Sequence, residues 1–388
     1  MTLPGHSVLP SLAVLFLGAC AGERWVERLP RAPREMPLRV AARDLGPLFR
    51  PPADWPDAFL ARGCGLGDDG TAAFTTDVTG PGPNGATKHN AQIWIQRGDQ
   101  GQTATAPGAI AGYAGRVAAD GRVVGALLFG SEAAAWHDNT LRPLLVAQDG
   151  GLTLVTDLSV EGQAFGIGES GLLVGCELGG LGPVYGLPAA LPVAWDSVVA
   201  THRRIGAPGP SGIALDANAH GVVVGHGRLS IDGGWNHVGW IQAADGTVRL
   251  IGNEAVAVDD AGRIAVNTGA EAALNDADGA LRHALAPLVA EPLAWARVED
   301  LSEDGIAVGA SNGREVVWSG FSNRGRARCR DLNELVRGAV PDGLVLDAVL
   351  RINARHDLLC EGRLRNAQGE WGAPHAWLVS GLRWFTGE

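Results

Sequence analysis

The chain has 388 residues, of which 56 are Gly and only 19% are charged, and its aromatic residues include 12 Trp against 2 Tyr. A high glycine content with few charges is typical of many tight turns between packed strands. The formal net charge of −11 argues against a nucleic-acid partner, because affinity for nucleic acid comes largely from Lys and Arg that neutralise phosphates.

The first residues predict a signal peptide. The apolar run 8–17 is too short to span a bilayer but suits the core of a secretion signal. Residues 17–20 (LGAC) resemble a bacterial lipobox, in which Cys20 would be lipidated, whereas residues 19–21 (ACA) suit an ordinary cleavage site equally well. A buried apolar N-terminus is the third alternative, because no Lys or Arg precedes the run. We predict that residues 1–20 direct export, to an envelope-anchored or extracellular protein.

The next segment, residues 21–37, mixes four Arg with three Glu and three Pro and has no sustained period. Such a composition predicts a tether. The remaining residues, 38–388, contain no comparable linker, so we predict a single domain there.

Gly166, Gly168 and Gly171 have the G-x-G-x-x-G spacing of a dinucleotide-binding loop. Such a loop must leave a strand and begin a helix, because the helix N-terminus binds the phosphate. After Gly171, however, the sequence Leu-Leu-Val-Gly continues as a strand, and only the last glycine of the motif persists in similar stretches elsewhere. The spacing therefore predicts turns, and no nucleotide or other cofactor.

The persistent glycine marks a repeat whose copies lie between 41 and 51 residues apart. It follows a polar or small residue in each unit, as in a tight hairpin where the chain needs a positive φ. In the seventh unit His356 takes its place, and His tolerates positive φ better than most residues. The six glycines are Gly70, Gly121, Gly171, Gly221, Gly262 and Gly305.

Each unit continues with a short apolar strand, a spacer, a strand that ends in Trp, and then often a second turn and a fourth strand such as 247–252. Four antiparallel strands in about 40 to 50 residues are typical of a β-propeller blade. We therefore predict an all-β propeller of seven blades, with the repeated Trp packed between blades rather than stacked on a ligand. The Trp positions are Trp94, Trp136, Trp195, Trp240, Trp318 and Trp377, with Leu274 in the fifth unit.

Closure of the ring requires a strand from one end of the chain. Residues 38–46 resemble the inter-unit segments 154–159 and 328–335, and they could complete the last blade beside 375–380. Pairing there would remove an exposed sheet edge. The C-terminal residues 381–388 compete for the same place, so two closures stay open.

The last unit contains His375, Ala376 and Trp377 in PHAWLVS, after an upstream stretch DLNELV…LDAVLRINARHDLLCEG. Looser copies are HNAQIW, AAAW, PVAW, HVGW and EVVW. Over about residues 38–386 the units resemble the HAF repeats of predicted extracellular bacterial proteins. The resemblance implies a secreted repeat protein with a propeller-like fold, and it carries no settled biochemical activity.

Metal and catalytic motifs give little support to an enzyme. No Cys or His cluster has zinc spacing, and the stretch 274–283 has Asp276 and Asp278 but lacks the distal Glu of a calcium loop. We predict no metal site. Four cysteines allow three disulfide connectivities, with isolated buried thiols as the simpler alternative. They are Cys64, Cys176, Cys329 and Cys360.

Carboxylates gather in the hairpins that carry the persistent glycine, and so on one face of the propeller. We interpret them as solvated turn residues, because two acids alone do not establish a site without a known separation and shifted pKa values. They are Asp68, Asp69, Asp120, Glu169, Asp259, Asp260, Glu303 and Asp304.

The connections between second and third strands vary in length and must lie on the opposite face. Long loops on a rigid scaffold are common binding sites. Aromatic rings beside Gly and Asn suit sugar or peptide recognition, although ordinary loop packing explains them too. The four long connections are 77–90, 177–191, 228–236 and 363–374, and their candidate ligand-binding residues are His89, Tyr185, Trp235 and Trp371.

Two functions are compatible with these sequence features. The first is an exported, noncatalytic binding or protein-interaction propeller whose partner is a glycan or peptide, with membrane contact only through a lipid on Cys20. The alternative is a cell-envelope polysaccharide hydrolase or lyase with its site at the propeller axis, where two carboxylates would have to lie at catalytic separation. The fold alone does not separate them, and we assign no catalytic residue.

Overall fold

The structure is a computed structural model. It describes residues 40–46, 59–77, 79–81, 87–89, 91–130, 140–154, 161–181, 188–196, 202–206, 209–231, 234–320 and 327–382. By its contacts the chain divides into residues 1–37 and 38–388, and only the second part contains described residues. The predicted signal peptide with Cys20 and the predicted tether lie outside them.

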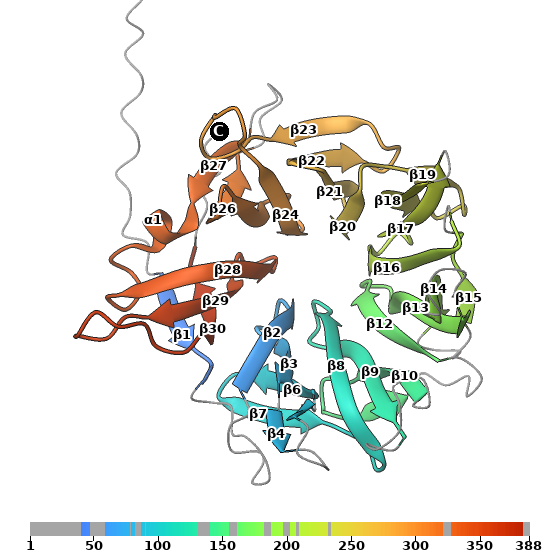
Figure 1. Cartoon of the computed structure of the whole chain (residues 1–388), viewed down its shortest axis with the longest axis horizontal. Helices are drawn as coiled ribbons and strands as arrows, with labels where there is room; N and C mark the ends of the chain where they lie inside the picture. Colours follow the sequence, from blue (N-terminus) through green and yellow to red (C-terminus); the bar gives the residue numbers. More distant parts are fainter. Residues whose placement is uncertain are drawn as a thin grey trace, which may run out of the picture. The chain divides into compact units, whose positions relative to one another are not determined.

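Seven antiparallel sheets of four strands each form a seven-bladed propeller, as predicted, and their innermost strands surround the centre of the ring (Figure 1). Blades 1 and 2 contain β2 (Phe59–Leu66), β3 (Ala72–Asp77), β6 (Gln92–Arg97) and β7 (Gln100–Ala104), then β8 (Ala109–Val117), β9 (Val123–Phe129), β10 (Thr140–Val146) and β11 (Leu152–Leu154). Blades 3 and 4 contain β12 (Gly162–Ile167), β13 (Leu172–Leu181), β14 (Pro188–Asp196) and β15 (His202–Arg204), then β16 (Ser211–Ala217), β17 (Val223–Ile231), β18 (Gly234–Gln242) and β19 (Val248–Leu250).

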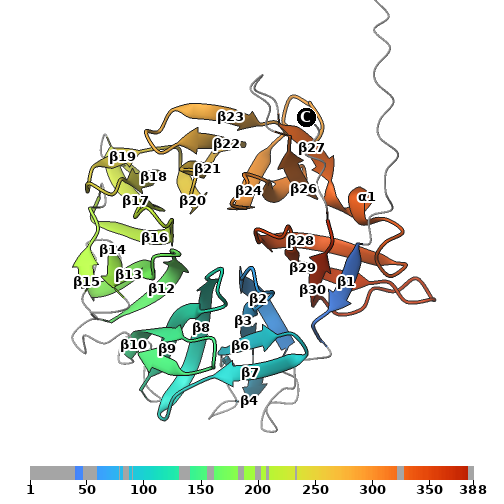
Figure 2. The ribbon, with the colours of Figure 1, turned by 180° about the vertical axis from the view of Figure 1, so that it is seen from behind.

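The second half of the ring repeats the same plan, and Figure 2 shows it from behind. Blades 5 and 6 contain β20 (Glu254–Val258), β21 (Arg263–Thr268), β22 (Glu271–Asp276) and β23 (Leu281–Leu285), then β24 (Ala296–Leu301), β25 (Ala307–Ser311), β26 (Arg314–Ser319) and β27 (Arg328–Asp331). Blade 7 contains β28 (Leu344–Ile352), β29 (Leu358–Leu364), β30 (His375–Ser380) and β1 (Ala41–Asp44). One short helix in the described part, α1 (Leu332–Val336), follows β27.

The persistent glycines occupy the first hairpin of each blade with φ between 76° and 91°, and His356 has φ 63°. In each turn the N–H of this residue donates to the carbonyl three residues earlier, as from Gly171 to Gly168 at 2.9 Å. The strand β13 begins directly after Gly171. The motif at 166–171 is therefore a hairpin, as predicted.

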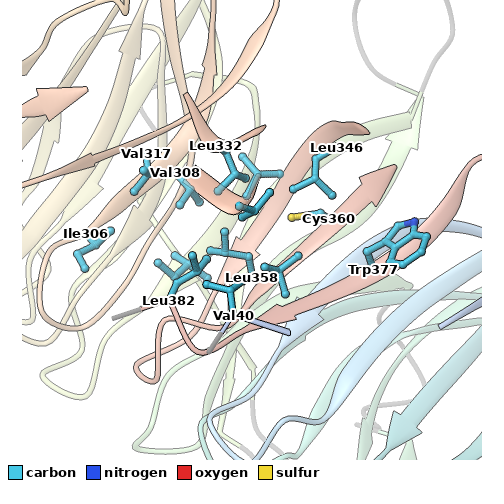
Figure 3. Close-up of a cluster of buried hydrophobic side chains, with 14 of the residues drawn as sticks. Val40, Ile306, Val308, Val317, Leu332, Leu346, Leu358, Cys360, Trp377 and Leu382 are labelled. Carbon is cyan, nitrogen blue, oxygen red and sulfur yellow. The ribbon is translucent and has the colours of Figure 1, made fainter. Parts of the chain in front are cut away.

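The repeated Trp side chains are buried between adjacent blades. Trp195, Trp240 and Trp318 are at most 1% exposed, and Leu274, their counterpart in blade 5, is fully buried. Trp240 packs with Val174 and other residues of blade 3. Figure 3 shows the corresponding cluster between blades 6 and 7, where Val317 and Leu332 face Leu346 and Leu358. The core prediction is confirmed for these positions, while Trp136 lies outside the described residues.

The ring is closed by the N-terminal strand. β1 pairs antiparallel with β30 from Ala41 opposite Ser380 to Asp44 opposite Trp377. Leu45, just after β1, is 1% exposed and packs against Phe74 of blade 1. Of the two closures left open by the sequence, the one through residues 38–46 is therefore the one that forms.

The long connections are less loop-like than the sequence suggests. Residues 228–236 belong mostly to β17 and β18, which extend their ladder to Ile231 opposite Gly234. Between β3 and β6 the chain forms an extra two-stranded sheet of β4 (Thr79–Pro81) and β5 (Thr87–His89). The connection 177–191 is also shortened, because β13 and β14 pair as far as Leu181 opposite Pro188. The expectation of long loops is wrong at these three places, because strand pairing satisfies backbone hydrogen bonds that a loop would leave to water.

No disulfide joins Cys64, Cys176, Cys329 and Cys360, which come from four different blades. Cys176 and Cys360 are buried. Among the described residues the alternative without disulfides is the correct one, but burial is confirmed only for Cys176 and Cys360, because Cys64 and Cys329 are partly exposed.

Candidate functional site

The inner strands place equivalent residues at the same depth around the axis, and the hairpin glycine gives their register. The position five residues before each hairpin glycine, or before His356, carries two Arg, two Asp and three small residues. In blade order they are Gly65, Arg116, Gly166, Asp216, Ala257, Asp300 and Arg351. We call these seven residues the axial ring.

Every inner strand has a β-bulge at this depth, where its register with the second strand shifts. A bulge re-aims side chains relative to the regular alternation. The small members of the axial ring let neighbouring strands approach: a Cβ on Gly65 would lie 2.4 Å from the nitrogen of Val117, and one on Gly166 2.5 Å from the carbonyl oxygen of Leu215.

Arg116 extends from blade 2 across the axis to three other blades. Its Nη1 lies 2.8 Å from Asp300 Oδ1 and 3.5 Å from Asp216 Oδ2, and its Nη2 donates to the carbonyl of Val256 at 3.0 Å. Loss of hydration opposes the charge of Arg116, but the two carboxylates outweigh it and raise the pKa of the guanidinium. Arg116 therefore stays charged and holds the ring together electrostatically.

The two axial carboxylates also bind backbone. Asp216 accepts a hydrogen bond from Val258 N at 3.0 Å, and Asp300 accepts one from Ile352 N at 3.1 Å. Each donor belongs to the next blade along the chain, so each Asp ties two inner strands together. Burial raises the pKa of Asp216 to about 6 even though Arg116 and the Val258 N–H favour its ionised form.

Arg351 differs from Arg116 in its partners. Its Nε donates to the carbonyl of Cys64 at 2.8 Å and its Nη1 to that of Leu350 at 2.6 Å. It forms no ion pair with any carboxylate that the structure describes. Burial and the charge of Arg116 lower the pKa of Arg351. The ring thus contains one cation with partners that are all neutral.

A cavity of about 530 Å³ lies on one side of the axial ring, with Arg116 and Arg351 among its lining residues. It occupies the end at which the chain enters the inner strands, and hence the face that carries the second-to-third-strand connections. We call it the axial cavity. Its apolar lining is contributed by Tyr113, Phe165, Ile213, Leu215 and Val256.

Charged residues line another part of the axial cavity. Arg297 binds Glu254 and Glu299, with each nitrogen-to-oxygen distance 2.9 Å. His226 lies near them, and burial lowers its pKa, so it is neutral at physiological pH. The cavity therefore has an apolar side from blades 2 to 5 and a charged side from blades 5 to 7.

A smaller cavity of about 90 Å³ lies on the hairpin side of the axial ring and is lined by acidic turn residues. Asp68 accepts a hydrogen bond from Ala354 N at 2.7 Å, and Glu303 accepts one from Asp260 N at 2.8 Å. Each bond joins two adjacent blades. Loss of hydration, with nearby Asp260 and Asp259, raises the pKa of Glu303 to about 7. These carboxylates cap neighbouring turns.

One predicted turn carboxylate is not solvated. Asp259 is 0% exposed, accepts from Arg263 N at 2.7 Å and forms an ion pair with the Arg263 side chain. The interpretation as solvated turns is wrong at this position, because the turn folds Arg263 over it. Within the described part of the chain, no group of three or more His, Cys, Asp or Glu side chains could hold a metal ion.

The two predicted aromatic anchors whose side chains the structure describes, Trp235 and Trp371, lie in different blades. Trp235 is the second residue of β18 in blade 4 and is 46% exposed, and Trp371 of blade 7 is 45% exposed. The guanidinium carbons of Arg363 and Arg365 lie 5.4 and 4.9 Å from the Trp371 ring centroid, so this ring already has cation–π partners. Tyr185 lies outside the described residues, and for His89 the structure describes only its backbone in β5.

Sequence reasoning missed the axial ring. A signal was present, since the ring residues stand at a constant offset from the hairpin glycine in all seven units. Regular alternation of side chains between the two faces of a strand does not identify these residues, because the β-bulge in each inner strand interrupts that alternation at the axial ring.

No protein-family model matches the chain, and no curated protein matches it. Among solved structures, the chain is similar to TolB from Acinetobacter baumannii (12% identity, TM-score 0.35, 57% of this chain and 53% of TolB). It thus spans about half the length of TolB. The propeller domain of the Trilobed protease from Pyrococcus furiosus has 11% identity and a TM-score of 0.45 over 85% of this chain and 97% of that domain.

An acylaminoacyl peptidase from Pyrococcus horikoshii has 13% identity and a TM-score of 0.46 over 84% of this chain and 52% of the peptidase. The propeller fold of the present chain rests on the strand pairing described above. In the described segments, no helix has the length and apolar character needed to cross a lipid bilayer.

Proposed function

We propose that this protein is an exported binding propeller that holds a ligand in the axial cavity and performs no chemistry on it. The observation that carries the proposal is the cavity of about 530 Å³ at the ring centre, with an apolar side and a charged side. Pockets of this size and mixed lining are typical of small-molecule and peptide side-chain binding.

The hydrogen bonding of the axial carboxylates supports binding over catalysis. Asp216 and Asp300 both contact Arg116, and both accept a backbone N–H of the next blade. A general acid or base needs an oxygen free to reach the reacting atom. Both oxygens of Asp300 are engaged in this way, whereas Asp216 binds Arg116 and Val258 N through the same oxygen, Oδ2.

The alternative, a polysaccharide hydrolase or lyase, is favoured by one observation. Asp216 has a pKa raised to about 6 beside Asp300 at the axis, and two carboxylates in unequal environments are the usual pattern of such enzymes. Incubation with cell-envelope polysaccharides and mass spectrometry of the products separates the two functions. The binding function predicts unchanged polysaccharide, and turnover that Asp216→Asn abolishes would establish the enzyme.

Export is the second part of the proposal, supported by residues 1–20 and by the resemblance to HAF repeats of predicted extracellular proteins. Growth with a radiolabelled fatty acid should label the wild type at Cys20, and the variant Cys20→Ala should carry no label. An unlabelled wild type found outside the cytoplasm would favour simple cleavage. A cytoplasmic wild type would contradict export.

Glycan and peptide arrays test binding directly. We expect the wild type to retain a ligand that Phe165→Ala, on the cavity wall, binds less well. Trp235 and Trp371 would extend the same face outward, and their Ala variants test whether the ligand reaches beyond the cavity. Loss of array binding only in the Trp variants would move the site to the outer face.

A further inference from the structure

We propose that the ligand of the axial cavity carries a carboxylate on an apolar body, and that Arg351 binds the carboxylate. This inference rests on the proposed binding function and deepens it by naming the chemical class. It draws on the partners of Arg351, the two-sided lining of the axial cavity and the difference in charge between this cavity and the small cavity on the hairpin side.

Arg351 has a guanidinium nitrogen available to a ligand. Nε and Nη1 donate to backbone carbonyls, while Nη2 makes no hydrogen bond to a residue that the structure describes. Arg351 lines both cavities at the axis. A cation taken out of bulk water without an ion-pair partner is costly, so a ligand that supplies the partner would be favoured at this position.

Arg116 is also charged, but both of its terminal nitrogens already have hydrogen-bond partners. Its two terminal nitrogens are bound to Asp300 and to the carbonyl of Val256, with Asp216 close by. Arg116 is thus held by its own partners and does not compete with Arg351 for the ligand. An anion at Arg351 would also relieve the repulsion between the two guanidinium groups.

The apolar body of the ligand is inferred from the opposite wall. Phe165, Leu215 and Val256 occupy the bulge position of three consecutive inner strands, six residues before the hairpin glycine. Ile213 and Tyr113 continue this surface outward. A ligand with its head at Arg351 would place its apolar part against these side chains, where burial favours binding.

A singly charged carboxylate fits the cavity better than a phosphate. Of the three lining arginines, Arg297 is paired with Glu254 and Glu299, and Arg116 is paired with Asp216 and Asp300, so Arg351 carries the one lining positive charge without an ion pair to a described carboxylate. A dianion would exceed that charge and meet the two Glu. The small cavity on the hairpin side has six acidic and two basic lining residues, so it repels anions, and entry from the axial cavity is favoured.

The test uses three probes that share a phenylalkyl body: 4-phenylbutyrate, its neutral amide and 2-phenylethyl phosphate, titrated into the full chain and followed by ligand-observed NMR. The wild type should bind the carboxylate about 10- to 100-fold more tightly than the amide, as expected for a charge-assisted hydrogen bond. Arg351→Met should abolish that preference, and Arg351→Lys should restore part of it. Arg282→Met, at an exposed arginine of β23, is the matched control and should bind like the wild type.

Equal binding of carboxylate and amide by the wild type, a preference that survives in Arg351→Met, or tightest binding of the phosphate would each overturn the inference. If no probe binds up to about 10 mM while an array ligand still binds, the carboxylate inference fails and the proposed function stands. If array ligands fail as well, the proposed function fails with it. Melting curves of the variants show whether each one is folded.

Discussion

Gly70 and Gly309 represent two positions that recur through the blades, and each requires glycine for a different reason. Gly70 has φ 86°, and a Cβ added there would have no atom within 4 Å. Only the backbone conformation therefore disfavours a side chain at this position. A Cβ on Gly309 would lie 2.0 Å from the carbonyl oxygen of Arg297, opposite the bulge of β24. Glycine at the second position therefore allows two strands to approach.

We expect Gly70→Ala to lower the free energy of unfolding by about 1 kcal/mol, the usual penalty for a left-handed conformation. Gly309→Ala should lower it by about 3 kcal/mol, because backbone has to move. Urea denaturation of both variants measures the difference. Equal losses would show that the close approach of β24 and β25 is not as tight as described.

The ionisation of the buried Glu315 side chain makes the stability of the folded protein depend on pH. It is 8% exposed, and it accepts a hydrogen bond from Val349 N at 2.7 Å. Burial, with the nearby charges of Glu299 and Asp347, raises its pKa to about 7. Because this exceeds the unfolded value, the folded protein keeps a proton that the unfolded chain has released, and this contribution to stability falls as pH rises from about 4.5 to 7.

Glu315→Gln should therefore stabilise the protein at pH 8 by about 1 to 3 kcal/mol, since the amide oxygen still accepts from Val349 N and carries no charge. At pH 4.5 the variant and the wild type should be equally stable. Chemical denaturation at the two pH values checks this, with the exposed Glu291→Gln as control. A variant that is less stable at pH 8 would refute the account of this side chain.

At the scale of elements, the third strands of blades 1, 3, 4, 6 and 7 carry a buried Trp that packs with neighbouring side chains. Trp195 in β14 is 1% exposed and Trp235 at the start of β18 is 46% exposed. We expect Trp195→Ala to destabilise by about 3 to 5 kcal/mol and Trp235→Ala to leave the melting temperature nearly unchanged. Similar losses in both variants would mean that Trp235 packs as a core residue.

Strands and turns could be predicted from the sequence wherever the backbone geometry restricts which residue types can occupy a position. The hairpin glycines, with His356 in the last unit, identified seven blades because positive φ restricts the residue there. The extension of β17 and β18 to Ile231 and Gly234 was not predictable, because polar and glycine-rich residues are compatible with strand or loop. The axial ring was missed because a bulge changes which residues face the axis, and a bulge depends on strand pairing.

For the whole molecule, closure by β1 determines whether the ring is stable. β1 supplies the outer strand of blade 7, and Leu45 after it is buried against blade 1. A chain that begins at residue 47 should lose about 3 kcal/mol of stability, given the apolar area of Leu45 and Val40, and should aggregate through the exposed edge of β30. A chain that begins at residue 38 should melt like the full chain. If both truncations behave alike, β1 does not close the ring.

The central claim is that a ligand binds in the axial cavity at the centre of the propeller, on the side of the second-to-third-strand connections. Leu215 lines that cavity, and Leu215→Trp would fill part of it, whereas Trp235→Ala changes only the outer face. Calorimetric titration of the two folded variants with the same array ligand is the most direct measurement. The account predicts that Leu215→Trp weakens binding at least about 10-fold, a loss of about 1.4 kcal/mol, while Trp235→Ala changes it little; unchanged affinity in Leu215→Trp would contradict the claim.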